Sequence, residues 1–299
     1  MITKSDDIAW LGVGKMGLPI AGLIAGAGYR VTAFDVSADR MAAARRQGLA
    51  VAASAIEVIN RKAVIFTSLP DDKAIRDLLL SKGLLDAIAP QSILIETSTV
   101  SAEISAELAK AAREHKIDYL RLPVSGSASI AHTGALTCFV SGPKAAFERV
   151  KPLLASFTRA QTYLGQDEQA RYAKLAVNLM IAVSAGMMAE SLALARKGGI
   201  GWQDILQVLD DSAVASPMVK YKTPPLARRD FESTFSCRQM AKDLDLILGA
   251  GHSAGVPLQL AAQLRETYAS LIAQGDGDAD YIATVLHQER LSGLGDPKT

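Results

Sequence analysis

The sequence predicts a doubly wound α/β domain followed by an all-α domain. Residues 8–164 alternate short strand-like segments with segments of helical spacing, a pattern typical of βαβ units around a parallel sheet. Beyond residue 165 no segment has a clear strand pattern, and a long helix is expected at residues 167–197. A length of 299 residues also favours two domains. We therefore expect an α/β domain over residues 1–164 and a helical domain built on the long helix over residues 165–299.

The individual elements follow from composition and spacing. Segments rich in β-branched or aromatic residues predict strands at residues 8–13, 31–35, 64–68, 92–96 and 119–123, with a last pair at 136–141 and 161–164. Helical spacing predicts helices at 16–27, 38–47, 72–80 and 102–115, and then at 167–197, 202–211, 238–249, 258–274 and 278–288. Gly28 and Gly48 stand where helix C-terminal caps fall.

Composition restricts the class of partner and compartment. Lysine and arginine (32) balance aspartate and glutamate (31), which argues against a nucleic-acid partner. The first ten residues lack the apolar core of a signal peptide, so a cytoplasmic protein is expected. The longest apolar run, residues 175–189, is shorter than the roughly 20 residues that span a bilayer. Cys138 and Cys237 fit no metal-ligand spacing, and both are interpreted as small core residues in a reducing compartment.

A glycine motif indicates dinucleotide binding. The run Gly12-Val-Gly14-Lys15-Met16-Gly17 follows an apolar strand and opens a helix, as the G-x-G-x-x-G fingerprint requires. Gly12 permits the tight turn, Gly14 leaves room for a pyrophosphate, and Gly17 lets helix and strand pack closely. The helix N-terminus supplies amide donors for the phosphates. This context predicts a Rossmann-type domain whose first turn, including Lys15 and Met16, contacts the cofactor.

Asp35 bears on the choice of cofactor. It ends the second predicted strand, eighteen residues after Gly17. A carboxylate there bonds the ribose hydroxyls of NAD and repels the 2′-phosphate of NADP. Arg40, five residues on, is expected to face solvent. NAD is therefore favoured over NADP.

Two further strand ends are expected near the cofactor. Leu69-Pro70-Asp71 follows the strand at 64–68, and Thr97-Ser98-Thr99 follows the strand at 92–96. Ligands of doubly wound sheets collect at the carboxyl ends of strands. Leu69, Pro70 and Thr99 are accordingly predicted cofactor contacts, with Thr99 also near the substrate, although Ser, Thr and Asp at such positions are equally typical of helix caps.

The long helix carries the candidate reactive group. Lys174 and Asn178 are four residues apart and share one helical face, in a segment apolar nearly all round. A buried lysine needs partners or a lowered pKa, and a lowered pKa suits proton transfer near neutral pH. The alternative is that Lys174 reaches water among Glu168, Gln169 and Arg171 in the polar first turns.

Taken together, six motifs resemble those of the β-hydroxyacid dehydrogenases, which include 3-hydroxyisobutyrate dehydrogenase and tartronate semialdehyde reductase and belong to the 6-phosphogluconate dehydrogenase NAD-binding superfamily. The resemblance covers about residues 8–286. The motifs are Gly12-x-Gly14-Lys-Met-Gly17-Leu-Pro, Leu69-Pro70-Asp71, Ser98-Thr99-Val100, Pro123-Val-Ser-Gly126, Lys174-x-x-x-Asn178 and Lys242-Asp243-Leu244.

The resemblance implies a role for each motif. Lys174 would act as general acid or base on the substrate oxygen, and Asn178 would help to hold that oxygen. Ser125 and Gly126 would bind the substrate carboxylate, and Lys242 would close over the nicotinamide. The implied reaction is hydride transfer between nicotinamide and a small 3-hydroxy acid or its semialdehyde. Such proteins associate as homodimers or homotetramers through the helical domain.

The chain departs from the family pattern at three places. Arg121 stands where an acid is frequent, and it is interpreted either as a ligand for a second acidic group or as part of a structural ion pair. Glu168 and Ala170 replace glycines before the lysine. The stretch Lys220-Tyr221-Lys222 either faces the substrate or is plain surface.

Individual positions bear on whether the chain has another activity known for this fold. Val177 and Ile181 stand where decarboxylating 6-phosphogluconate dehydrogenases carry histidine and glutamate, which argues against sugar-phosphate decarboxylation. Imine reductases generally lack the lysine, so Lys174 favours hydroxy-acid chemistry. The alternatives are an imine-reductase-like or small-aldehyde reductase, and a non-catalytic dinucleotide-binding scaffold.

Overall fold

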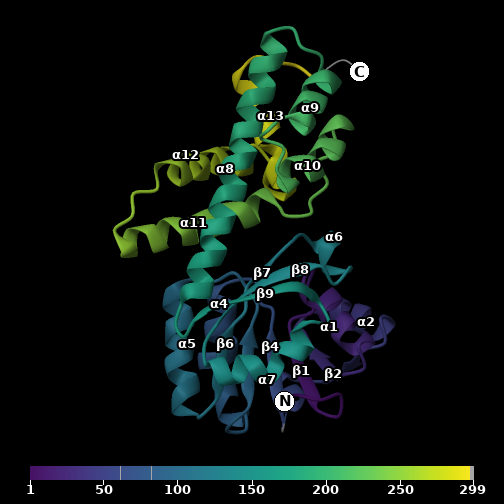
Figure 1. Cartoon of the computed structure of the whole chain (residues 1–299), viewed down its shortest axis with the longest axis vertical. Helices are drawn as coiled ribbons and strands as arrows, with labels where there is room; N and C mark the ends of the chain where they lie inside the picture. Colours follow the sequence, from purple (N-terminus) through teal and green to yellow (C-terminus); the bar gives the residue numbers. More distant parts are fainter. Residues whose placement is uncertain (61, 82, 297–299) are drawn as a thin grey trace. The chain divides into compact units, whose positions relative to one another are not determined.

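The computed structural model describes residues 1–60, 62–81 and 83–296 (Figure 1). The chain divides into two compact units, Met1–Lys174 and Leu175–Thr299. The division falls inside the long helix α8 (Gln169–Lys197), whose first two turns belong to the first unit.

The first unit is built on one sheet. Its described strands are β1 (Asp7–Leu11), β2 (Arg30–Phe34), β3 (Ala50–Val51), β4 (Val64–Thr67), β5 (Ile93–Glu96), β6 (Asp118–Arg121), β7 (Val124–Ser125), β8 (Leu136–Ser141) and β9 (Thr158–Gly165). The order begins β3-β2-β1-β4-β5-β6, with all neighbours parallel, which is the strand order of a dinucleotide-binding fold. β8 is antiparallel to β6 and to β7, and β9 runs parallel to β8.

Strand side chains alternate between two buried layers. Ile8 and Trp10 of β1 face a core shared with α1 (Gly17–Gly26), α2 (Ala38–Arg46) and α7 (Lys144–Leu154). Ala9 and Leu11 face the opposite core, which α3 (Ala55–Ile59), α4 (Asp72–Ile75) and α5 (Ala102–Glu114) cover. Between α4 and α5 lie a π-helical stretch, η1 (Arg76–Ser81), and a short 3₁₀ helix, η2 (Leu84–Ala87); α6 (Ala128–Ala131) follows β7. Because both faces are covered, the strands read as nearly continuous apolar runs.

The described part of the second unit is helical. It contains the rest of α8, α9 (Trp202–Asp211), α10 (Pro217–Ala227), α11 (Cys237–Ala254), α12 (Gln259–Ala273), η3 (Asp276–Asp278), η4 (Tyr281–Ala283) and α13 (Thr284–Leu291). α8 is long and apolar enough to cross a membrane, but Ala182, Ala185 and Leu192 lie buried in this unit's core, as in a core helix. Ser236 and Gln239 form a capping box that starts α11.

Several elements differ from expectation. α7 and α10 were not predicted. α7 contains Pro152 and α10 contains Pro224 and Pro225, and a proline within a helical pattern indicates a helix break. The direction of the last pair of strands was not predicted, and β8 runs antiparallel to β6. Cys138 and Cys237 are buried, and burial raises the pKa of each thiol to about 12, so both remain thiols at neutral pH.

Candidate active site

The glycine turn has the geometry of a dinucleotide cradle. Gly12 has a φ of +95°, and a Cβ there would lie 2.2 Å from the Ser68 carbonyl oxygen. A Cβ on Gly17 would lie 2.0 Å from the Gly12 carbonyl oxygen. A Cβ on Gly14 would meet only the Arg40 guanidinium, 3.8 Å away. The turn therefore excludes side chains where it packs and leaves backbone open at the start of α1, which fits a pyrophosphate. The nearby Lys15 is exposed and Met16 is half-buried.

Asp35 is held firmly at the end of β2. Its carboxylate accepts hydrogen bonds from the Val13 amide and the Ser37 amide, both 2.9 Å long. Arg40 was expected to face solvent, and its side chain is 57% exposed, but its guanidinium returns to within 3.6 Å of the Asp35 carboxylate. The ribose end of the predicted cofactor site thus contains a fixed anion with a cation beside it.

The turns after β4 and β5 are joined to each other. The 97–99 turn contacts the 69–71 turn through the Ser98 hydroxyl, which accepts a 2.7 Å hydrogen bond from the Leu69 amide. The Thr97 hydroxyl donates to the Thr67 carbonyl oxygen over 2.8 Å. Leu69, Pro70 and Thr99 therefore follow adjacent parallel strands at the same edge of the sheet as the glycine turn.

Gly126 is sterically required. Its φ is +134°, and a Cβ would lie 2.6 Å from a methyl carbon of Leu136. Ser125 ends β7 and is paired with Thr137 of β8, so the antiparallel β7–β8 ladder presents the Ser-Gly turn. This is the turn that the family resemblance assigns to the substrate carboxylate.

Arg121 and Glu168, two of the residues that depart from the family pattern, form an ion pair with each other. The Arg121 Nε donates to the Glu168 carboxylate over 2.9 Å, and its Nη1 donates to the Gln166 carbonyl oxygen over 3.3 Å. Both side chains of the pair are largely buried. Arg121 is therefore a structural ion-pair partner, and the residue that replaces a glycine before α8 is the acid that Arg121 needs.

In the second unit, Asn178 and Lys242 meet at a residue that had not been assigned a role. The Asn178 side-chain amide donates to Asp243 Oδ2 over 2.5 Å, and Lys242 Nζ lies 3.0 Å from Asp243 Oδ1. Asp243 and Asn178 are buried, while the Lys242 side chain is about a third exposed. Asp243 thus orients both predicted site residues, and its place beside Lys242 in the Lys242-Asp243-Leu244 motif is the sequence signal that could have identified it.

Lys222 belongs to the interior of the second unit and is neither surface nor a free cation. Its Nζ donates to Asp280 over 2.6 Å and lies 4.4 Å from the centre of the Tyr281 ring. Burial lowers the pKa of this lysine, and the Asp280 carboxylate partly offsets that effect. Tyr221, 44% exposed, donates to or accepts from the Tyr281 hydroxyl.

The comparisons with known proteins agree with this fold. Residues 7–165 match the family model described as the NAD binding domain of 6-phosphogluconate dehydrogenase, and residues 169–287 match that described as NAD-binding of NADP-dependent 3-hydroxyisobutyrate dehydrogenase. The two halves together define an NAD(P)-binding oxidoreductase. The chain belongs to the β-hydroxyacid dehydrogenase family.

Individual relatives match over nearly their whole length. The chain is 31% identical to the 3-hydroxyisobutyrate dehydrogenase of Pseudomonas aeruginosa, over 91% of this chain and 94% of the relative. It is 29% identical to the 2-(hydroxymethyl)glutarate dehydrogenase of Eubacterium barkeri, over 97% of each chain. Among solved structures, 3-hydroxyisobutyrate dehydrogenase of Mycobacterium tuberculosis with L-serine superposes with a TM-score of 0.86 at 29% identity, covering 94% of this chain and 98% of that one.

Proposed function

We propose that the chain transfers a hydride between a nicotinamide dinucleotide and a small 3-hydroxy acid or the matching semialdehyde, with Lys174 as general acid and base. The observation that carries the proposal is the cluster in which Asp243 holds both Asn178, one helical turn beyond Lys174, and Lys242. The side-chain-free glycine cradle of the first unit supports a dinucleotide as the hydride carrier. The named compounds of the similar proteins support the substrate class, because each has a hydroxymethyl group on the carbon that bears a carboxylate.

Each predicted site residue has a defined task in this proposal. The dinucleotide, when bound, supplies the hydride acceptor or donor. Lys174 removes the proton of the substrate hydroxyl during oxidation and returns it to the carbonyl oxygen during reduction. Asn178, oriented by Asp243, donates a hydrogen bond to the same oxygen. Ser125 and the Gly126 amide receive the carboxylate, and Thr99 and Lys242 contact both substrate and cofactor.

NAD is the proposed cofactor. The Asp35 carboxylate is fixed by two backbone amides, so it cannot rotate away from a 2′-phosphate without losing both hydrogen bonds. Repulsion of that phosphate favours NAD. The Arg40 guanidinium, 3.6 Å from the Asp35 carboxylate, would attract a 2′-phosphate and so opposes this repulsion.

The experiment that tests the proposal follows nicotinamide absorbance with purified protein. NAD and NADP are each combined with a panel of small 3-hydroxy acids, and the reduced cofactors with the matching semialdehydes and cyclic imines. We expect turnover of a 3-hydroxy acid, with a higher kcat/KM for NAD than for NADP. Turnover of imines alone would replace the proposal by an imine reductase. Tight cofactor binding without turnover of any of these compounds would favour a scaffold.

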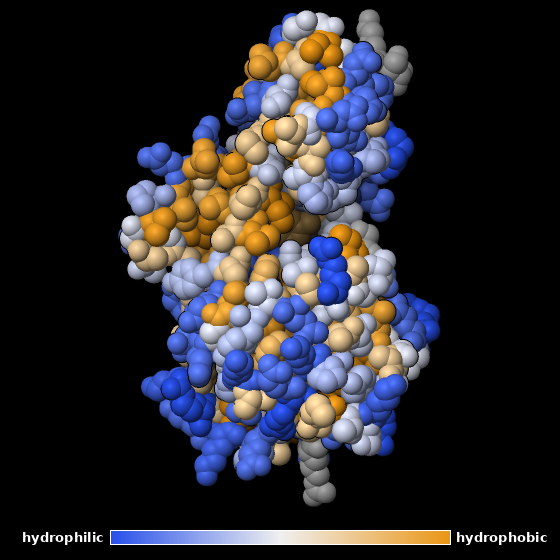
Figure 2. Space-filling model, viewed as in Figure 1, coloured by the Kyte–Doolittle hydropathy of each residue, from blue (hydrophilic) through white to orange (hydrophobic). Residues whose placement is uncertain are grey.

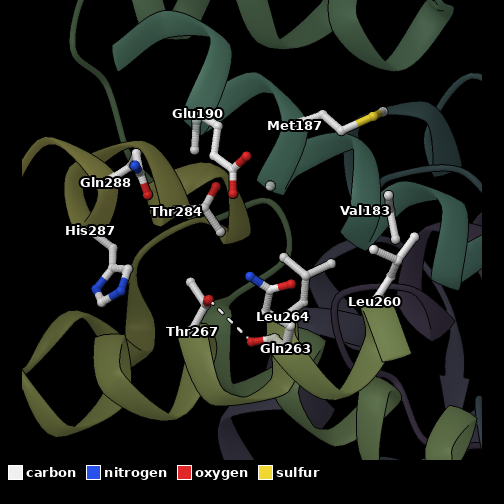
Figure 3. A pocket seen from close by; sticks show the side chains of 12 residues that line it. Val183, Met187, Glu190, Leu260, Gln263, Leu264, Thr267, Thr284, His287 and Gln288 are labelled. Carbon is white, nitrogen blue, oxygen red and sulfur yellow. Dashed lines mark hydrogen bonds between the residues drawn. The ribbon is translucent and has the colours of Figure 1, made fainter. Parts of the chain in front are cut away.

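We also propose that the protein is a homodimer or homotetramer that associates through α8. Met180, Met187 and Leu194 are exposed and seven residues apart, so they form one stripe along the helix. Figure 2 shows apolar surface gathered over α8, α11 and α12. Beside the stripe lies a pocket of about 250 Å³ between α8, α12 and α13, with Leu260 and Leu264 on its apolar wall (Figure 3). An exposed apolar surface of this kind is typical of a subunit interface.

Light scattering coupled to size exclusion tests the interface. Wild-type protein is expected to elute as a dimer or tetramer, and Met187→Glu as a smaller species, because the carboxylate would be buried at the contact. Val208→Glu is the matched control, since Val208 is an equally exposed apolar residue on α9, outside the stripe. A monomeric wild type, or a Met187→Glu variant of unchanged mass, would contradict the proposal.

The cytoplasmic location and the lack of nucleic-acid and membrane partners stay predictions.

A further inference from the structure

The first turn of α8 carries an arginine buried in the first unit. Arg171 is 1% exposed, and every nitrogen of its guanidinium donates a hydrogen bond. Nε donates to the Ser105 hydroxyl over 3.2 Å, and Nη1 to the Ser98 carbonyl oxygen over 2.8 Å. Nη2 donates to the Tyr119 hydroxyl over 3.0 Å and to the Glu96 carboxylate. Burial alone would lower the pKa of this guanidinium, and Glu96 more than offsets it, so Arg171 stays charged.

Ser98 links this arginine to both turns that are expected near the cofactor. Its amide donates to Glu96 Oε1 over 2.6 Å, its hydroxyl accepts from the Leu69 amide over 2.7 Å, and its carbonyl oxygen accepts from Arg171. The three polar groups of Ser98 thus reach the end of β5, the 69–71 turn and the start of α8. Loss of Arg171 would leave the Ser98 carbonyl and the buried Glu96 carboxylate without their main partner.

Lys174 stands one helical turn beyond Arg171, about 4.5 Å further along the axis at 1.5 Å per residue. The height and rotation of that turn are therefore set by where the guanidinium is anchored. Displacing a reacting group by about 1 Å is enough to lower a rate by about 100-fold.

We infer that Arg171 is a positioning residue: by binding Glu96 and the Ser98 carbonyl, it fixes the helical turn of Lys174 to the 69–71 and 97–99 turns. The inference rests on the proposed function for its consequence on turnover. The inference also predicts that the 69–71 and 97–99 turns bind cofactor less well without Arg171. Cofactor affinity is measured without substrate, so this part does not depend on the proposed reaction.

The Arg121–Glu168 ion pair serves as a control for the Arg171–Glu96 ion pair. It too is a largely buried arginine–glutamate pair at the entrance of α8. In the described part of the chain its contacts run to the Gln166 carbonyl and the Tyr119 ring, and not to the two turns. Removing Arg121 therefore breaks a buried ion pair, as removing Arg171 does, but leaves the hydrogen bond from Arg171 to the Ser98 carbonyl oxygen in place.

The experiment compares Arg171→Met, Arg171→Lys and Arg121→Met with wild type. Three quantities are measured: the melting temperature, the Kd for reduced cofactor from nicotinamide fluorescence, and kcat and KM well below melting. Both methionine variants are expected to melt earlier. The Arg171 variants should in addition lose about 100-fold in kcat with a smaller change in substrate KM, and bind cofactor several-fold more weakly. Arg121→Met should stay within about threefold of wild type in both.

The outcomes distinguish the positioning role of Arg171 from the proposed activity. Arg171→Lys keeps a cation beside Glu96 but lacks the planar fork that serves four acceptors, so it decides the question if Arg171→Met does not fold. Arg171 variants that melt early yet match Arg121→Met in kcat and cofactor Kd would overturn the inference. If no substrate is turned over by wild type, the proposed function fails, while the cofactor Kd still reports whether Arg171 holds the turns.

Discussion

Lys174→Ala is expected to lower kcat by about 10²–10⁴-fold, the range over which a positioned acid–base group contributes to proton transfer. The variant loses the group that takes the hydroxyl proton, while the glycine turn, Asp35 and the 69–71 turn remain intact. Cofactor affinity should therefore change little, and the loss should fall on kcat. Steady-state kinetics over a range of pH, together with cofactor fluorescence titration, measure both quantities.

Lys197→Ala is the control for this prediction. Lys197 is an exposed lysine at the last turn of the same helix, and its removal should leave kcat at the wild-type value. A Lys174→Ala protein that turns over at the wild-type rate would exclude Lys174 as the acid–base group. A variant with normal kcat and raised KM would assign it to substrate binding alone.

Asp280→Ala is expected to lower the free energy of unfolding by about 3–5 kcal/mol, the usual effect of breaking a buried ion pair. Asp280 is buried and accepts hydrogen bonds from Lys222 over 2.6 Å, from the Thr234 amide and hydroxyl over 3.1 and 2.9 Å, and from the Ile282 amide over 3.1 Å. Its removal leaves Lys222, a residue only 3% exposed, without the carboxylate that pairs with its ammonium group. Urea or guanidinium unfolding followed by circular dichroism measures the change.

Two variants make the cause of that loss explicit. Asp278→Ala removes a carboxylate two residues away whose side chain is 90% exposed, and its denaturation midpoint should match wild type. The double variant Asp280→Ala with Lys222→Met should be more stable than Asp280→Ala alone, because it removes the unpaired charge. A double variant no more stable than the single one would show that the lost hydrogen bonds from Thr234 and Ile282, absent from both variants, account for the loss instead.

The parts of the fold that could be predicted are those with a local signal. The strands around the glycine turn and most of the helices with a regular apolar face were predicted to within a few residues, because burial on both sheet faces imposes runs that are visible in the sequence. The helix predicted at 278–288 is an exception, since α13 begins only at Thr284, after the short 3₁₀ helices η3 and η4. α7 was missed because Pro152 lies inside it, and β7 because two residues carry no period. The direction of β8 depends on which strand it pairs with, which no local pattern encodes.

In the candidate site, too, the features with a local sequence signal could be predicted and those that depend on distant residues could not. The glycines and Asp35 follow one another in a fixed local order, so the cofactor turn could be predicted from spacing. The partners of Arg121, Asn178 and Arg171 lie 47, 65 and 75 residues away in the sequence. Whether a charged residue is a ligand or half of an ion pair depends on such distant partners. Arg171 carried no signal of its own, apart from being an arginine in the first turn of an otherwise apolar helix.

The Arg121–Glu168 pair makes the tolerance of each position depend on the other. Both side chains are largely buried, so replacing either one alone leaves the other charge without its counterion. Replacing both together by apolar residues removes the two charges at once and should cost less than the sum of the two single changes. The two positions, 47 residues apart in the sequence, are therefore energetically coupled.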